Sequence, residues 1–374
     1  MNQILIKEVT SKSIVWFENS NQYLILENAA AEIVAHLYCD KSIEEIAEDL
    51  EKKLSIPYEK AVDFVIDINE QIIKPNKVKK ITPIHNSEFK VPSSFEFIKY
   101  YKINQKILKV ALSNEFELSL IHPKFAHLEV EHTENVHFYF QTFNKDNYTY
   151  LVLDNELIGS WVKKEIHYFQ GKFSMKIIEC IYEKIEEKWM GVFHASAINH
   201  QENSMLILGD SGNGKSTSLA LLQAHGFHCI ADDFVPIDDQ KNVHAFPAGI
   251  SIKKNSLPVL LDYYPELNTS AEYHFKRLNK TVRYLPPKDI NYKKSYPCVG
   301  LIFIKYDANT EFECKEISKL EAFQNLIPDS WISSIPENVT VFLDWFSELT
   351  CYQLTYSKNE FMIEKVKQLF ENDL

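Results

Sequence analysis

A short glycine-rich segment contains the residues that most clearly indicate a binding or catalytic site. It matches the pattern G-x-x-x-x-G-K-[ST] and holds three of the chain's nine glycines. In loops of this pattern the glycines let backbone N–H groups approach phosphates, the lysine reaches the β- and γ-phosphates, and the hydroxyl binds Mg²⁺. The sequence therefore predicts a site for ATP and Mg²⁺ formed by Gly209, Asp210, Ser211, Gly212, Asn213, Gly214, Lys215, Ser216 and Thr217.

The residues around this segment predict the elements that would position it. The apolar run at 205–208 is typical of a buried strand, and residues 217–225 have a helical pattern that Gly226 would end. A loop between a strand and a helix N-terminus directs its N–H groups and the partial positive charge of the helix at a phosphate. The alternative is a glycine-rich turn with a solvated lysine, which the strand and the helix on either side disfavour.

Two adjacent acids, Asp232 and Asp233, end the next apolar run along the chain. The end of a strand is where open α/β sheets place their chemistry. Two adjacent carboxylates can have different roles, since one can bind Mg²⁺ while the other faces an acceptor hydroxyl as a base. A plain turn with two solvated aspartates is the alternative, but the nearby phosphate loop favours a functional role.

A histidine and two arginines are further candidate residues of the functional site. His194 lies in an apolar run just before the predicted strand, and on its own this pattern is more typical of a structural core histidine. Of the 40 basic residues only Arg277 and Arg283 are arginines, and they lie close together. A guanidinium group there could neutralise charge on a transferred phosphoryl group, and the alternative is a pair of surface arginines on a loop.

The composition of the chain excludes several classes of protein. The chain has 374 residues and a net charge of −12, which argues against a nucleic-acid binder. No apolar stretch reaches membrane-spanning length, and the N-terminus lacks the pattern of a signal peptide. The six cysteines are scattered without a C-x-x-C pair, so we expect reduced thiols, no zinc site and a cytoplasmic location.

The patterns along the chain predict several domains. Short strand-like runs up to residue 26 precede helical patterns up to residue 73, where Ser42 and Glu45 form a capping box. A proline- and lysine-containing linker is expected at 76–94. Alternating apolar and polar residues then predict a mainly antiparallel sheet. The expected division is 1–75, the linker 76–94, a β-rich middle region at 95–190 that packs on the last domain, and 191–374.

The second half of the chain resembles the C-terminal domain of HPr kinase/phosphorylase. The resemblance rests on His194 with the three residues after it, the phosphate loop, and the Ala231-Asp232-Asp233 run. It implies that Asp232 acts as a base on the acceptor hydroxyl, that His194 has a functional role, that Ser216 and Asp233 lie near the metal, and that Arg283 neutralises charge. The E-x-R-G-x-G signature is absent between 245 and 300, so the resemblance extends neither to HPr as substrate nor to phosphorolysis.

Two further resemblances concern the acceptor. Residues 245–253 and 282–287 look like segments of divergent HPr-kinase-like proteins, which include kinases of ribosomally made precursor peptides. Residues 20–75 resemble PqqD-like domains, which bind leader peptides by adding a strand to a sheet edge. This implies an edge strand near 14–26 with Ile14, Trp16 and Leu24 forming shallow pockets. The alternative is a winged-helix unit with a purely structural role.

Together these patterns predict an α/β protein, α+β overall, with a P-loop kinase domain, a winged-helix-like N-terminal domain and a β-rich middle segment. The expected reaction is ATP- and Mg²⁺-dependent transfer of the γ-phosphoryl group to a serine or threonine hydroxyl of a peptide or small protein bound by residues 1–75. A small-molecule kinase and a non-catalytic ATP-dependent sensor or scaffold are the alternatives. No nucleic-acid or membrane partner is expected, while GTP as the nucleotide and a homo-oligomer stay open.

Overall fold

The computed structural model describes residues 3–79, 90–275 and 280–372. The chain is mixed α/β, with 38% helix, 34% strand and several mixed sheets. It divides into two compact units. The N-terminal unit comprises residues 1–83, 319–323 and 332–348, and the larger unit comprises 84–318, 324–331 and 349–374. No helix among the described residues is long and apolar enough to cross a membrane.

The N-terminal unit begins with an antiparallel three-stranded sheet in the order β1-β2-β3. As the sequence predicts, helices follow the strands, and the Ser42–Glu45 capping box is present at the start of α2. The elements are β1 (Ile4–Val9), β2 (Lys12–Phe17), β3 (Gln22–Glu27), α1 (Asn28–Tyr38), α2 (Ile43–Leu54), α3 (Tyr58–Ile68) and α4 (Lys74–Lys77). The expected linker at 76–94 falls largely outside the described residues.

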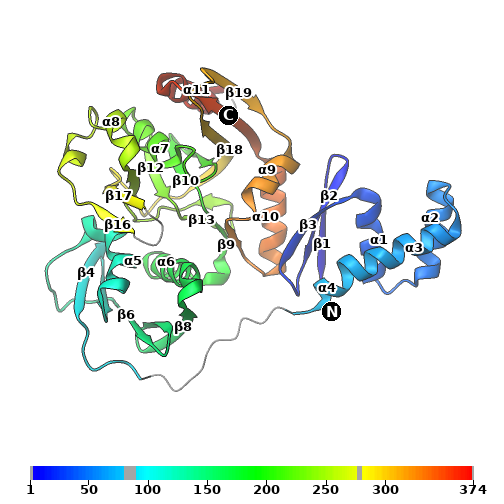
Figure 1. The fold of residues 1–374 in the computed structure, drawn as a ribbon, viewed down its shortest axis with the longest axis horizontal. Helices are drawn as coiled ribbons and strands as arrows, with labels where there is room; N and C mark the ends of the chain where they lie inside the picture. The colour runs from blue at the N-terminus through cyan, green and yellow to red at the C-terminus, as the bar shows by residue number, and fades with distance from the viewer. Residues whose placement is uncertain (1–2, 80–89, 276–279, 373–374) are drawn as a thin grey trace. The chain divides into compact units, whose positions relative to one another are not determined.

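Both faces of this sheet are covered. Val15 and Phe17 pack with the helices α1–α3 in one buried cluster. A helix from much later in the chain, α10 (Pro336–Glu348), lies along β1–β3 in Figure 1. The Lys7 ammonium lies 2.6 Å from the Asp344 carboxylate, and the rings of Tyr23 and Phe342 are 5.7 Å apart. Residues 332–348, which the sequence analysis placed in the last domain, therefore belong to the core of the N-terminal unit.

The position of β2 corrects one expectation about peptide binding. Ile14 and Trp16 lie on β2, which is the central strand, and both side chains are fully buried. They belong to the core of the unit because α10 covers their face of the sheet, where Tyr23, the partner of Trp16 on β3, contacts Phe342, and they form no surface pockets. The sheet edges are β1 and β3, and of the three expected pocket residues only Leu24, which is partly buried, lies on an edge strand.

The larger unit contains the expected β-rich region as a five-stranded sheet in the order β4-β5-β6-β7-β8. All neighbours are antiparallel except β5 and β6, which are parallel because α5 crosses between them. The elements are β4 (Phe97–Ile103), β5 (Lys106–Leu112), α5 (Glu115–Phe125), β6 (Phe138–Lys145), β7 (Tyr148–Leu153), β8 (Glu156–Val162) and α6 (Ile166–Tyr182).

A ten-stranded mixed sheet forms the centre of the larger unit (Figure 1). Its main path runs β12-β10-β11-β18-β14-β13-β9-β20, while β21 pairs with both β18 and β19. The bounds are β9 (Trp189–Phe193), β10 (Ser196–His200), β11 (Asn203–Leu208), β12 (His228–Asp232), β13 (Val235–Asp238), β14 (Asn242–Val243), β18 (Tyr296–Tyr306), β19 (Phe312–Glu316), β20 (Ser330–Ile332) and β21 (Thr350–Tyr356).

Helices and a small sheet complete the described structure. Helices α7 and α11 contribute buried side chains to the same core cluster as β11, β18 and β21, among them Leu219, Ile302 and Val366. A separate three-stranded sheet has the order β15-β17-β16. The bounds are α7 (Lys215–Ala224), β15 (Ile250–Lys253), α8 (Leu257–Leu260), β16 (Tyr273–Phe275), β17 (Lys280–Leu285), α9 (Lys319–Leu326) and α11 (Asn359–Asn372).

Candidate phosphate and acceptor site

The glycine-rich segment forms the strand–loop–helix that its sequence predicts. Strand β11 ends at Leu208, and α7 begins at Lys215 directly after the loop. Gly209 and Gly214 have φ angles of +137° and +95°, which L side chains rarely adopt. A Cβ atom at Gly209 would also lie 2.5 Å from the backbone oxygen of Ile304. The loop therefore needs glycine at these positions to pass close to β18.

Loop residues line a cavity together with side chains from distant parts of the larger unit. The ammonium group of Lys215 donates to the backbone oxygens of Gly209 and Asp210, and that of Lys253 donates to Ser211 Oγ at 3.3 Å. Burial lowers the pKa of Lys215, although the neighbouring aspartates oppose this effect. The lining comprises His194, Asp210, Ser211, Gly212, Gly214, Lys215, Ser216, Thr217, Asp233, Ser251, Lys253, Ser256 and Lys280.

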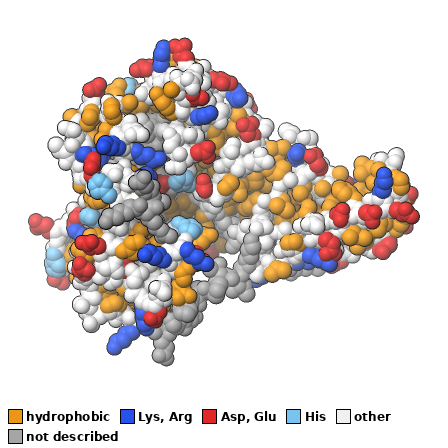
Figure 2. Space-filling view, in the orientation of Figure 1, with side chains coloured by type: hydrophobic (Ala, Val, Ile, Leu, Met, Phe, Trp, Pro, Cys, Tyr) orange, Lys and Arg blue, Asp and Glu red, His pale blue; other side chains and the backbone are white. Residues whose placement is uncertain are grey.

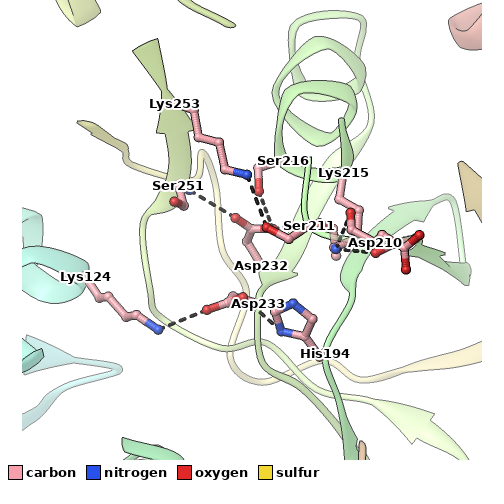
Figure 3. Close-up of polar contacts among 12 residues, drawn as sticks. Lys124, His194, Asp210, Ser211, Lys215, Ser216, Asp232, Asp233, Ser251 and Lys253 are labelled. Carbon is pink, nitrogen blue, oxygen red and sulfur yellow. Dashed lines mark hydrogen bonds and ion pairs between the residues drawn. The ribbon is translucent and has the colours of Figure 1, made fainter. Parts of the chain in front are cut away.

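Asp232 is buried beside the phosphate loop, at the end of β12 (Figure 3). Its carboxylate accepts hydrogen bonds from Ser196 Oγ at 2.6 Å, Ser251 N at 3.0 Å and Ser216 Oγ at 3.2 Å. Ser196 lies directly opposite Asp232 in the pairing of β10 with β12, which explains the first contact. Burial raises the pKa of Asp232, and the charge of Asp233 adds to this effect.

These contacts pair Ser216 with a different aspartate from the one expected. The sequence analysis placed Ser216 and Asp233 together at the metal, whereas Ser216 Oγ contacts Asp232. Strand β12 ends at Asp232, and Asp233 follows it with a left-handed backbone, so the two adjacent carboxylates point in different directions. Which of them contacts the loop depends on the register of β12 against β10 and is not visible in the local sequence.

The oxygen atoms of Ser216 and Asp232 fit a bound Mg²⁺. Mg²⁺ prefers oxygen ligands and is usually held by one or two protein groups, with phosphates and water completing the octahedron. Among the described residues no group of three or more His, Cys, Asp and Glu side chains forms a metal cage by itself. This donor set suits a cation that arrives with a nucleotide.

The carboxylate of Asp233 contacts Lys124 and His194 (Figure 3). It lies 3.0 Å from Lys124 Nζ and 3.0 Å from His194 Nδ1. Asp233 has a left-handed backbone with φ of +69°, and its N–H donates to the backbone oxygen of Ala195. Burial alone would raise the pKa of Asp233, but Lys124 and His194 outweigh burial and hold this pKa well below its usual range.

His194 is not the core histidine that its apolar surroundings suggested. It lies in the bend between β9 and β10, where its imidazole lines the cavity with a side chain 39% exposed. The hydrogen bond to Asp233 raises the pKa of His194. The structure thus brings His194, Asp233 and the phosphate loop to one cavity.

Lys124 is a site residue that sequence reasoning missed. It lies at the end of α5 in the β-rich region, 109 positions before its partner Asp233. Its backbone oxygen accepts a hydrogen bond from Gly249 N at 2.8 Å, and the ring of the next residue, Phe125, lies 5.9 Å from that of Phe246. No local motif distinguishes Lys124 in a lysine-rich chain, so only the packing of α5 identifies it.

Arg283 has its partners away from the phosphate loop in this structure. Its guanidinium group donates to the backbone oxygens of Leu267, Asn268 and Ser270 and lies 2.9 Å from the Glu272 carboxylate. These contacts fix the 3₁₀ turn at Pro265–Asn268 and the residues that follow it. Arg283 does not line the cavity, so its expected phosphoryl contact stays a prediction, and Arg277 lies outside the described residues.

A scan against models of known protein families found no match, and no curated protein matched the chain. The function is therefore inferred from the residues and their arrangement.

Proposed function

We propose that this chain is an ATP- and Mg²⁺-dependent kinase that transfers the γ-phosphoryl group to a serine or threonine hydroxyl of a peptide or small protein. The observation that carries the proposal is the shared cavity, in which the phosphate loop and the Asp233–His194 pair form parts of one lining. A phosphate donor on the loop and a hydroxyl beside Asp233 would then lie within reach of each other, and phosphoryl transfer depends mostly on such positioning.

The loop, Lys215, Ser216 and the two aspartates each have a defined part in this proposal. The loop N–H groups and Lys215 would bind the β- and γ-phosphates, and Ser216 with Asp232 would hold Mg²⁺, which would supply positive charge beside the phosphates. The acceptor oxygen attacks the γ-phosphorus, and the bond from that phosphorus to the bridging oxygen of ADP breaks. Asp233 receives the hydroxyl proton. This assignment exchanges the roles that the sequence analysis gave to Asp232 and Asp233.

The low pKa of Asp233 is compatible with this part. A carboxylate paired with Lys124 and His194 is ionised at neutral pH and is a weak base. Phosphoryl transfer passes through a loose transition state that demands little from the nucleophile. Asp233 therefore acts chiefly by orienting the acceptor hydroxyl, and it takes up the proton as the new bond forms.

The proposal includes the finer fold assignment that the resemblances imply. It takes the central sheet with its phosphate loop as an HPr-kinase-like domain and the three-stranded sheet with α1–α3 as a PqqD-like domain. An extended peptide would add to β1 or β3, the edge strands of that sheet, through backbone hydrogen bonds. Acidic residues in the first turn of α2, Glu44 and Glu45, favour a peptide that carries lysine or arginine.

A phosphorylation assay with candidate acceptors tests the proposed function. The full chain is incubated with Mg²⁺-ATP and small peptides encoded beside its gene, and each peptide is examined by mass spectrometry for the mass of one added phosphoryl group. We expect phosphate on a serine or threonine with the wild-type protein and none with Lys215→Ala, which loses one cationic phosphate contact. Bound ATP with no phosphopeptide would favour the sensor, and transfer to a metabolite alone would favour the small-molecule kinase.

A further inference from the structure

Four lysine side chains from four elements converge around Asp232 and Asp233. They come from α5, α7, β15 and β17, and they are Lys124, Lys215, Lys253 and Lys280. In the view of Figure 2, lysine and arginine side chains gather over the part of the larger unit where β16 and β17 lie. Like charges that gather in a cavity repel one another, so such an arrangement favours the binding of an anion.

Three of these four ammonium groups have partners within the protein. Lys124 pairs with Asp233, while Lys215 and Lys253 donate to oxygen atoms of the phosphate loop. Lys280 lines the cavity, and its ammonium group makes no hydrogen bond or ion pair with any residue that the structure describes. A half-buried charge without a partner is costly, so Lys280 is the ammonium group most in need of an anionic ligand.

The pairing of β15 with β17 determines which basic side chains face the cavity. Lys253 lies opposite Val282, and Lys280 is two residues before Val282 on the same strand. Because side chains alternate along a strand, Lys253 and Lys280 share the cavity face. Arg283 lies opposite Ile252 on the other face. The sheet therefore presents ammonium groups to the cavity and uses its guanidinium group for structure.

Lys280 shares the lining of the cavity with Asp233 and with residues of the phosphate loop. Burial lowers the pKa of Lys280, and the charges of Lys253 and Lys124 lower it further, while Asp233 is the strongest of the charges that oppose this effect. A phosphoryl group that moves from the loop towards Asp233 would therefore stay within the cavity that Lys280 lines.

We propose that Lys280 binds the terminal phosphoryl group of the nucleotide and neutralises its charge during transfer, the part that the sequence analysis gave to Arg283. This inference rests on the proposed function. The ammonium group stays protonated throughout and contacts the non-bridging oxygens, while the acceptor hydroxyl gives its proton to Asp233. Because ADP lacks the terminal group, Lys280 should distinguish a triphosphate from a diphosphate.

Nucleotide binding by the full chain tests this inference without an acceptor. Dissociation constants for Mg²⁺-ADP and for the non-hydrolysable Mg²⁺-AMP-PNP are measured by calorimetry for the wild type, Lys280→Met, Lys280→Arg and Lys254→Met. Lys254 is the control because it is exposed and does not line the cavity. We expect Lys280→Met to weaken AMP-PNP about ten-fold and ADP less than about two-fold. Lys280→Arg should keep most of the preference, and Lys254→Met should match the wild type.

The two nucleotides separate the failure of this inference from that of the proposed function. The role of Lys280 would be overturned if Lys280→Met bound AMP-PNP as tightly as the wild type does. It would also be overturned if the variant lost the same factor of affinity for both nucleotides. Neither result would contradict the proposed kinase function. A wild-type chain that binds neither nucleotide would overturn both. Retained ADP binding shows that Lys280→Met is folded, and Lys280→Gln provides a second charge-removing variant if it is not.

Discussion

Ser216 Oγ lies 3.2 Å from Oδ1 of Asp232, while the adjacent Asp233 directs its carboxylate to His194 and Lys124. Two neighbouring acids thus have different surroundings, because Asp232 is buried beside the phosphate loop whereas Asp233 lines the cavity. In the proposed kinase this separates the group that holds the metal from the group that faces the acceptor, and it makes the two aspartates experimentally distinguishable.

Substitution of each aspartate by asparagine should have different kinetic effects. We expect Asp232→Asn to raise the Mg²⁺ concentration needed for half-maximal turnover, because the proposed Mg²⁺ site loses its carboxylate ligand. Asp233→Asn should lower kcat about 100-fold or more with little change in the KM for ATP, because the acceptor loses its orienting base. Steady-state kinetics at varied Mg²⁺ and ATP measure both. The opposite pattern would restore the roles inferred from sequence.

Removal of the Lys124 ammonium group should weaken catalysis although Lys124 lies outside the predicted kinase domain. We expect Lys124→Met to lower kcat about ten-fold or more, because Asp233 loses one of the two side chains that position it. Lys124→Arg should recover part of this loss. The matched control is Lys99→Met, which breaks the ion pair of Lys99 with Glu129 in the same β-rich region. Equal kcat values for both Met variants would make Lys124 a structural residue only.

A buried carboxyl group in α5 should make stability depend on pH. Burial raises the pKa of Glu117 to about 7, although hydrogen bonds from Ser113 and Asn114 oppose this. Between the unfolded value of 4.5 and about 7 the folded state binds the extra proton, so stability falls as pH rises through this range. The loss is at most about 3 kcal/mol.

Urea unfolding at pH 5 and pH 8 measures this effect. We expect the wild type to lose free energy of unfolding between these values. Glu117→Gln should lose less because it carries no titrating group. The control is Glu115→Gln, an exposed change in the first turn of the same helix, which should keep the wild-type slope. A wild-type free energy of unfolding that is equal at the two pH values would contradict the prediction.

A chain that begins at residue 90 should fail for a structural reason before peptide affinity can be compared. Helix α10 packs its aromatic residues, Phe342 among them, against the sheet that this truncation removes. We expect a lower melting temperature and more aggregation, because large apolar side chains become exposed. Circular dichroism and light scattering measure both. A truncated chain as stable as the full one would show that α10 needs no cover from the N-terminal strands.

A milder change tests the same packing in the intact chain. Tyr23→Ala removes the ring that contacts Phe323 and Phe342, and it should lower the melting temperature of the N-terminal unit. Tyr58→Ala is the control, since Tyr58 is an exposed aromatic residue of α3. Equal melting temperatures for the two variants would contradict the importance of the α10 contact.

The sequence analysis correctly predicted those structural features that are formed by residues adjacent in the sequence. The strand–loop–helix around the phosphate loop can be predicted from residues 209–216 and the apolar patterns on either side. Its conformation depends on glycines and hydrogen bonds within a few residues of one another. The capping box of Ser42 and Glu45 is local in the same way. The order of strands and helices in residues 1–73 also follows from side-chain periodicity, since the spacing of apolar residues reports which face is buried.

The spacing of apolar residues shows that a face is buried but does not show which segment of the chain covers it. That segment is known only from the tertiary structure. It placed Ile14 and Trp16 in a core completed by a helix from residues 336–348, and it brought Lys124 to Asp233 across 109 positions. It also turned Arg283 away from the cavity and Lys280 towards it through the pairing of β15 with β17. Ion pairs and strand register join residues distant in sequence, so their partners are determined only when the whole chain packs.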